Sequence, residues 1–178
     1  KSVDKLELFI EEVIQYSRNA RMPVQRMTFD FGKFVSDILL DHQYLPNFNK
    51  IEINVVDEID EEIRTDEMRL KIILNNLISN AIKFHRFDNG IKPRIDISIS
   101  ADSLNYFISV ADNGRGIQSE FVEKIFEMFF RGTEETQGSG LGLYILKETV
   151  MRLEGKIDVK SEIGKGTTFC VTIPKVIP

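Results

Sequence analysis

Residues 66–84 constrain the fold of this chain more than any other stretch. Apolar residues recur there at intervals of three and four, and Asp66 stands where a helix N-cap is expected. The pattern therefore predicts a helix that runs to about Phe84. One face of this helix is apolar and should pack into a core; it carries Leu70, Ile73, Leu74, Leu77, Ile78 and Ala81.

A second, polar stripe runs along the same helix. Asn76, Asn80 and Lys83 fall at positions i, i+4 and i+7 and therefore share one face. Asparagine is a weak helix former, so two of them in mid-helix need a reason. One interpretation is a solvated surface. The other is a ligand wall, in which an amide oxygen binds Mg²⁺ and the lysine ammonium group meets a phosphate.

The remaining patterns place helices and strands in separate runs rather than in strict alternation. Helical patterns cover 1–18, 30–45, 120–126 and 141–153, and strand patterns cover 51–56, 94–100, 106–111, 156–160 and 167–174. Strands that cluster beside a few long helices in this way predict an α+β fold, a two-layer α/β sandwich.

The composition excludes several classes of function. Lys and Arg number 23 against 28 Asp and Glu, and the net charge of −5 argues against a nucleic-acid partner. The single cysteine, Cys170, excludes an internal disulfide, and we expect it to face inward from a strand. No apolar run reaches the length of a membrane span, so a cytoplasmic location is expected. The first residue is Lys, and a membrane anchor elsewhere in a parent protein stays open.

Two glycine-rich segments follow the long helix. Asp-Asn-Gly-Arg-Gly-Ile at 112–117 is either a plain turn or a place where a flat ring approaches the backbone. In the second case the Asp112 carboxylate would accept a hydrogen bond from an exocyclic amine, which favours adenine over guanine. Gly-Ser-Gly-Leu-Gly-Leu at 138–143 leads into a helix, whose free N–H groups favour an anion. It lacks the Gly-Lys-Ser/Thr of a P-loop.

Taken in order, five motifs resemble the ATP-binding catalytic domain of sensor histidine kinases, in the GHKL superfamily with the Bergerat fold. They are Asn76-x₃-Asn80-x₂-Lys83, Asp112-x-Gly114-x-Gly116, Phe126-x₂-Phe129 followed by Arg131, Gly138-x-Gly140-x-Gly142 and Gly164-x-Gly166-Thr167. The resemblance covers about residues 30–174. It implies a mixed, largely antiparallel sheet covered by three main helices.

The same resemblance implies the roles of individual residues. Asn80 would bind Mg²⁺ with support from Asn76, and Asn80, Lys83 and Arg131 would be the catalytic residues at the phosphates. Asp112 would bind the adenine amino group, with Thr167 assisting through water. The other implied nucleotide contacts are Phe84, Gly114, Gly116, Ile117, Gly138, Gly140, Leu141 and Gly142. Phe126 and Phe129 are as well explained as core anchors, and residues 133–137 would form a lid.

Residues 1–22 resemble the end of a dimerisation hairpin with its linker, and residues 23–178 the ATP-binding domain. A helix docked on its own domain is the plainer alternative for the first part. His42 and His85 do not fit the family's phosphoacceptor motif and should be surface or packing residues. The implied partners are ATP, a histidine on a helix of the same or the dimer-mate chain, and a response regulator, in a homodimeric parent.

Two other functions compete with phosphoryl transfer from Mg·ATP to that histidine. ATP-hydrolysing relatives of the same fold carry a glutamate base four residues before the metal asparagine. Asn76 stands at that position, and an amide cannot accept a proton. An ATP-dependent interaction module with little catalysis is the second alternative.

Overall fold

The structure, a computed structural model, describes residues 2–59, 61–87, 90–132 and 138–175. Five strands form the main sheet: β2 (Glu52–Asp57), β4 (Arg94–Ala101), β5 (Asn105–Asp112), β7 (Gly166–Pro174) and β6 (Lys156–Glu162), in that spatial order. β2 pairs with β4 in parallel, and the other three pairs are antiparallel. The predicted mixed, largely antiparallel sheet is therefore confirmed.

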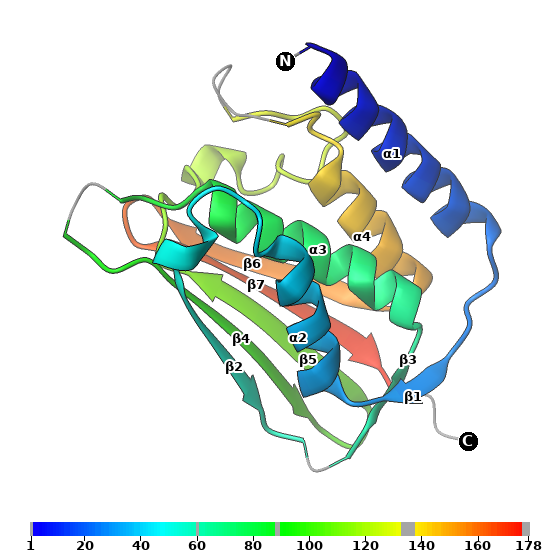
Figure 1. The fold of residues 1–178 in the computed structure, drawn as a ribbon. Coiled ribbons are helices and arrows are strands. Elements are labelled where there is room, and N and C mark those ends of the chain that lie inside the picture. Colours follow the sequence, from blue (N-terminus) through cyan, green and yellow to red (C-terminus); the bar gives the residue numbers. More distant parts are fainter. Residues whose placement is uncertain (1, 60, 88–89, 133–137, 176–178) are drawn as a thin grey trace.

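Three helices cover one face of this sheet, as Figure 1 shows: α2 (Phe31–His42), α3 (Glu67–Lys83) and α4 (Gly142–Arg152). The predicted cap of α3 is confirmed, because Asp66 accepts the Arg69 N–H at 2.9 Å; Asp30 caps α2 in the same way and accepts the Lys33 N–H at 2.6 Å. The core lies between the two layers. It includes the whole apolar stripe of α3 and alternate residues of the strands, among them Ile95, Ile97, Ile99, Ile108, Val110, Val171 and Ile173.

Several elements differ from the sequence prediction. α2 ends at His42 rather than at 45, because residues 43–45 leave the helix before Pro46; a 3₁₀ helix, η1 (Phe48–Lys50), follows. The helix expected over 120–126 is only a three-residue 3₁₀ helix, η2 (Ser119–Phe121), followed by turns. A second, two-stranded sheet, β1 (Met27–Phe29) with β3 (Ile63–Thr65), was not predicted, since strands of three residues carry too little periodicity.

The prediction for Cys170 is also wrong. Phe169 and Val171 are buried in the core, so the alternation of the strand turns Cys170 toward the opposite face of the sheet, where it is half-buried. The apolar run around it gave no sign of which of the two faces is the core.

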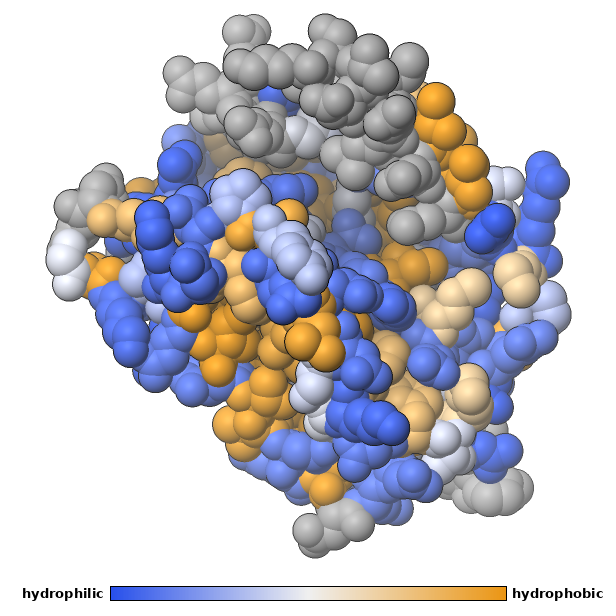
Figure 2. All heavy atoms as spheres, viewed as in Figure 1, coloured by the Kyte–Doolittle hydropathy of each residue, from blue (hydrophilic) through white to orange (hydrophobic). Residues whose placement is uncertain are grey.

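The N-terminal helix, α1 (Ser2–Arg21), lies beside α4 (Figure 1). The rings of Tyr16 and Tyr144 are 5.8 Å apart, and Asn19 Nδ2 donates to Thr149 Oγ1 at 2.9 Å. Hydrophobic side chains remain exposed along α1, at the upper right of Figure 2. α1 is thus docked on its own domain; that it ends a dimerisation hairpin stays a prediction. Within the described ranges, no helix is both long and apolar enough to cross a bilayer.

Candidate functional site

The C-terminal end of α3 meets the turn that follows β5. The Arg115 N–H donates to the Phe84 carbonyl at 3.0 Å, and a Cβ on Gly114 would lie 2.7 Å from the same oxygen. The Phe84 N–H donates a hydrogen bond to the Asn80 carbonyl, one helical turn earlier, at 3.0 Å. The polar stripe of the long helix and the turn at 112–117 are therefore neighbours.

Asp112 ends β5 opposite Thr167, its register partner on β7. Its Oδ1 accepts the Gly114 N–H at 2.8 Å. Burial raises the pKa of Asp112 to about 6, although hydrogen bonds from the backbone N–H groups of Gly114 and Thr167 oppose the shift. The carboxylate is thus held, largely desolvated, beside a buried threonine that is only 6% exposed.

Ser161, on β6, hydrogen-bonds to residues of both segments around Asp112, and the sequence analysis did not identify it. Its hydroxyl accepts the Ile117 N–H at 2.7 Å and lies 2.8 Å from the Thr167 hydroxyl. Ile117 and Thr167, two predicted contact residues, are therefore joined through one side chain. The signal available beforehand was weak: Ser161 is simply the strand position opposite Thr167 in the predicted hairpin.

The glycines of this turn also have a packing role. Gly116 has a φ of +72°, and a Cβ there would lie 2.1 Å from the Glu162 carbonyl oxygen. On the other side, a Cβ on Gly166 would lie 1.9 Å from the Asp112 carbonyl oxygen. Close contact between backbones explains why these positions need glycine. That Gly114 and Gly116 also let a base approach remains a prediction.

The glycine-rich turn before α4 lies against the other half of α3. A Cβ on Gly142 would lie 2.6 Å from Asn76 Oδ1, and Asn76 Nδ2 donates to the Ile72 carbonyl at 2.8 Å. Gly140 has a φ of +79° and its carbonyl accepts the Phe129 N–H at 3.0 Å. Asn76 of the polar stripe thus borders the glycine-rich turn before α4, while the C-terminal end of α3 borders the turn at 112–117.

Not every amide of this turn is available to a ligand. The Leu141 N–H donates to the Ser139 hydroxyl at 3.0 Å, and that hydroxyl donates to the carboxylate of Glu12 on α1. A phosphate at Leu141 would have to replace the serine. A Cβ on Gly138, with a φ of +135°, would meet nothing within 4 Å.

The two predicted phenylalanines differ in their surroundings. Phe126 packs edge-on against Phe169 with ring centroids 6.4 Å apart, and Lys147 Nζ lies 5.7 Å from its ring. Phe129 is 56% exposed and has a positive φ of 64°. Phe126 is therefore a core anchor. Arg131, Lys83 and Phe84 are exposed side chains, and the predicted lid, 133–137, lies outside the described residues.

The two histidines are packing residues. His42 and His85 are 8% and 3% exposed, and the Nδ1 atom of each pairs with a carbonyl one turn earlier, at 2.8 Å from Ile38 and 2.9 Å from Ala81. Desolvation lowers the pKa of His85. Neither is placed as a phosphoacceptor at the surface.

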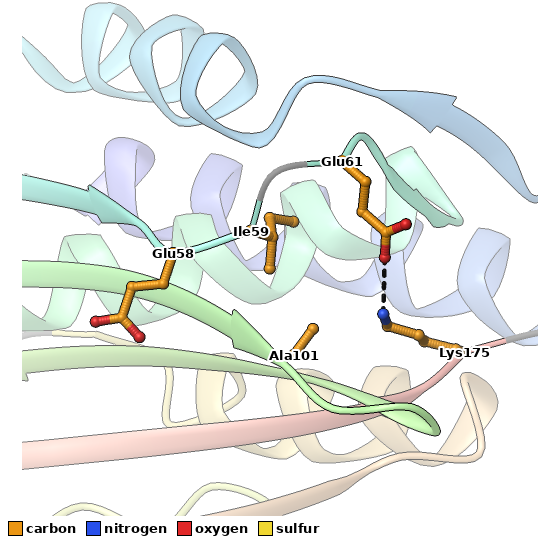
Figure 3. Close-up of a pocket in the computed structure, with 5 residues that line it drawn as sticks. All are labelled: Glu58, Ile59, Glu61, Ala101 and Lys175. Atoms are coloured by element: carbon orange, nitrogen blue, oxygen red, sulfur yellow. Dashed lines mark hydrogen bonds and ion pairs between the residues drawn. The ribbon is translucent and has the colours of Figure 1, made fainter.

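A separate hollow of about 270 Å³ lies at the far end of the sheet (Figure 3). Glu61 and Lys175 form an ion pair of 2.8 Å across it. It borders Ala101, whereas Asp112 pairs with Ile95 at the other end of β4, roughly 20 Å away along the strand. This hollow is not part of the candidate site.

Comparisons with known proteins place the same residues in one family. The family model for histidine kinase-, DNA gyrase B-, and HSP90-like ATPases matches residues 65–177. The autoinducer 2 sensor kinase/phosphatase LuxQ of Vibrio parahaemolyticus is 31% identical over 97% of this chain and 21% of its own length. The histidine protein kinase SaeS of Staphylococcus aureus (strain USA300) is 42% identical over 71% of this chain and 36% of its own length.

Solved structures agree with these relatives. The structure of full-length ShkA in complex with AMPPNP matches with a TM-score of 0.82 and 26% identity, over 97% of this chain and 36% of ShkA. The catalytic domain of the histidine kinase ThkA matches with a TM-score of 0.71 and 26% identity, over 85% of this chain and 98% of that domain. The chain spans only about a fifth to a third of the length of the curated relatives LuxQ and SaeS.

Proposed function

Because the chain belongs to the family of histidine kinase-, DNA gyrase B- and HSP90-like ATPases, we propose that it is the Mg·ATP-binding catalytic domain of a sensor histidine kinase. One observation carries the proposal. The C-terminal end of α3 is bonded through the Phe84 carbonyl to the turn after Asp112, and Asn76 of the polar stripe packs against Gly142, the first residue of α4.

The adenine end of the proposed site is formed by Asp112 and Thr167. A desolvated carboxylate next to a buried hydroxyl suits an exocyclic amine donor and disfavours the carbonyl of guanine. Ile117 would line the base from the side that Ser161 supports. Phe84, which is 36% exposed at the end of α3, would cover the nucleotide from the helix side.

The phosphate end is formed by Asn80, Lys83 and Arg131. The Asn76 side chain is committed to Ile72 and packs on Gly142, so Asn80 is the amide of the stripe that fits Mg²⁺, a cation that prefers hard oxygen ligands. The bound metal would neutralise charge on the phosphates. Lys83 and Arg131 would add positive charge there, and Gly138, Gly140, Leu141 and Gly142 would border the phosphates with backbone.

The proposed reaction is transfer of the γ-phosphoryl group of ATP to an imidazole nitrogen of a histidine on a dimerisation helix, with ADP as the leaving group. The domain contributes positioning and charge stabilisation rather than a covalent intermediate. The phosphoryl group would then pass to an aspartate of a response regulator. The parent would be a homodimer with this domain in the cytoplasm, and nucleic acid would not be a partner.

Hydrolysis of ATP is the weaker alternative. The position of the general base in hydrolysing relatives is Asn76, whose amide has no proton affinity at neutral pH and is already used in packing. An interaction module without catalysis would have the same site, and only the product of the reaction separates it from a kinase.

The test is to incubate the full-length parent protein with Mg·[γ-³²P]ATP and to map the labelled residue. We expect an acid-labile, base-stable phosphoamino acid on a histidine outside this domain. An acid-stable label would indicate a serine or threonine kinase. Nucleotide binding without any label would support the interaction module instead.

A further inference from the structure

Arg69, in the first turn of α3, is fully buried although it is charged. Its guanidinium group donates to Asp66 Oδ2 at 2.5 Å and to three backbone carbonyls from the last turn of α1 and the residues that follow it. These are the carbonyls of Asn19 at 3.0 Å, Met22 at 2.7 Å and Pro23 at 3.3 Å. One arginine thus binds three carbonyls from a stretch of five residues.

Asp66 serves both sides of this contact. Its Oδ1 caps α3 through the Arg69 N–H, and its Oδ2 accepts the Gln25 N–H at 2.8 Å as well as the Arg69 guanidinium group. Asp66 is 2% exposed, so the pair is a desolvated one in which neither member has water as a substitute partner. The start of α3 and the chain leaving α1 therefore share one buried ion pair.

α4 holds the same end of α1 from a second direction. Asn19 Nδ2 donates to Thr149 Oγ1 at 2.9 Å, and Arg152 donates to the Ala20 carbonyl at 2.7 Å. The segment 19–25 contains Met22-Pro23, where α1 has just ended. It is bonded to both helices that border the candidate site.

We propose that Asp66 and Arg69 are positioning residues for phosphoryl transfer, which hold α1 and the nucleotide-binding domain as one rigid body. This rests on the proposed function, in which the phosphoacceptor is carried by a helix joined to α1. Arg69 and Asn80 lie on the same helix, about 16 Å apart along its axis. The direction in which α1 leaves the domain is therefore fixed relative to the phosphate end of the site.

The decisive variant is Arg69→Lys, which keeps the charge beside Asp66. An ammonium group is compact and cannot bind the three carbonyls with a planar fork as a guanidinium does. The matched control is Arg64→Lys, because Arg64 is the exposed residue of β3, close to the start of α3. The measurement is the hydrogen exchange rate of the Gln25 amide, together with Mg·ATP affinity.

We expect the Gln25 amide to exchange at least about tenfold faster in Arg69→Lys than in Arg64→Lys, which is the effect of losing one or two buried hydrogen bonds. Nucleotide affinity should stay within about twofold in both variants. In the parent kinase, Arg69→Lys should lower the rate of histidine phosphorylation at least about fivefold at saturating ATP. Equal Gln25 exchange in the two variants, or full phosphorylation despite fast exchange, would overturn the proposal.

A second variant guards against misfolding of Arg69→Lys. Asn19→Ala removes the hydrogen bond to Thr149 without exposing or burying a charge. We expect this variant to raise the exchange rate of the Gln25 amide about threefold or more. An unchanged exchange rate in Asn19→Ala would count against the proposal that these contacts hold α1 on the domain. A wild-type domain that failed to bind Mg·ATP would refute the proposed function. The comparison of Gln25 exchange rates would still test whether Asp66 and Arg69 hold α1 on the domain.

Discussion

The fold disfavours the ionised form of Asp112, which is the form that an exposed aspartate adopts at neutral pH. Its carboxylate is buried at the end of β5, and its pKa of about 6 compares with an ordinary value of 3.8. That difference corresponds to about 3 kcal/mol of disfavoured ionisation near neutral pH. Two backbone N–H groups only partly offset the desolvation. An incoming amine donor would give this carboxylate the partner that the free domain lacks.

Replacing Asp112 by Asn should therefore stabilise the nucleotide-free domain while it weakens binding. Asn keeps an acceptor for the Gly114 N–H but carries no charge to desolvate. We expect the free energy of unfolding at pH 7 to rise by about 1–3 kcal/mol, and adenine nucleotide affinity to fall at least about tenfold. Urea unfolding and calorimetric titration measure the two effects.

The stability difference between Asp112→Asn and the wild type should depend on pH in one direction. The folded-state pKa of Asp112 is raised, so the cost of its ionisation is fully present above pH 6 and disappears as the pH falls toward 3.8. The gap in stability between the variant and the wild type should accordingly narrow from pH 7 to pH 4.5. A gap that stays constant over this range would show that the carboxylate is not the source.

At the residue scale, motif spacing identified residues whose segments come together only after folding. The types and order of Asn76, Asp112 and Gly142 fit one chemistry, and the segments that carry Asp112 and Gly142 both contact α3. Ser161 and Arg69 were missed because each acts through residues that are distant in the sequence and belongs to no motif. An arginine three residues after a helix cap looks like an ordinary surface pair until the fold buries it.

At the scale of elements, the length of a periodic pattern decided what was predictable. The helical period of α3 and the alternation of the long strands repeat often enough for their bounds to be predicted within a residue or two; these strands are β4, β5 and β7. The three-residue strands β1 and β3 form because β3 follows β2 closely and meets the chain leaving α1, which is a tertiary event. Within the turns after η2, Phe126 packs against Phe169 of β7, a contact between segments that are distant in the sequence.

The contact between the turn at 112–117 and the β6–β7 hairpin gives a prediction for an element. Gly116→Ala places a Cβ against the Glu162 carbonyl and forces a non-glycine residue to a φ of +72°. We expect the free energy of unfolding to fall by about 2–4 kcal/mol. Gly90→Ala is the control, with a similar φ of +66° but no atom within 4 Å, and should cost only about 1 kcal/mol. Equal losses would mean that strain alone, not the contact, requires glycine.

At the scale of the whole molecule, the candidate site is built from both layers: α3 and the start of α4 contribute from the helical layer, and Asp112 and Thr167 from the ends of β5 and β7. α3 is the central member of the helical layer, since it contacts α2, α4 and the sheet and is bonded to the chain leaving α1 (Figure 1). A ligand that contacts α3 and the turns at 112–117 and 138–143 would bridge segments that are distant in the sequence. Such a ligand binds only the folded domain, so binding should be visible as global stabilisation.

We expect Mg·ATP at about 100 times its dissociation constant to stabilise the domain by about 2.7 kcal/mol. For a domain of this size that corresponds to a rise in Tm of about 5–10 °C. Mg·GTP should give a much smaller rise.

Asn80→Ala should remove the part of the ATP shift that depends on Mg²⁺. Asn75→Ala, a neighbouring asparagine outside the polar stripe, should retain it. A magnesium-dependent shift of normal size in Asn80→Ala would exclude Asn80 as the ligand.

The outward orientation of Cys170 has a practical consequence. The chain contains one cysteine, and it lies on the sheet surface away from the helices, three residues along β7 from Thr167. Burial raises the pKa of its thiol, so alkylation will be slow at neutral pH and faster in mild alkali. A fluorophore attached there would report on the strand that carries Thr167 without occupying the proposed nucleotide site, and no other thiol of this chain would need to be removed first.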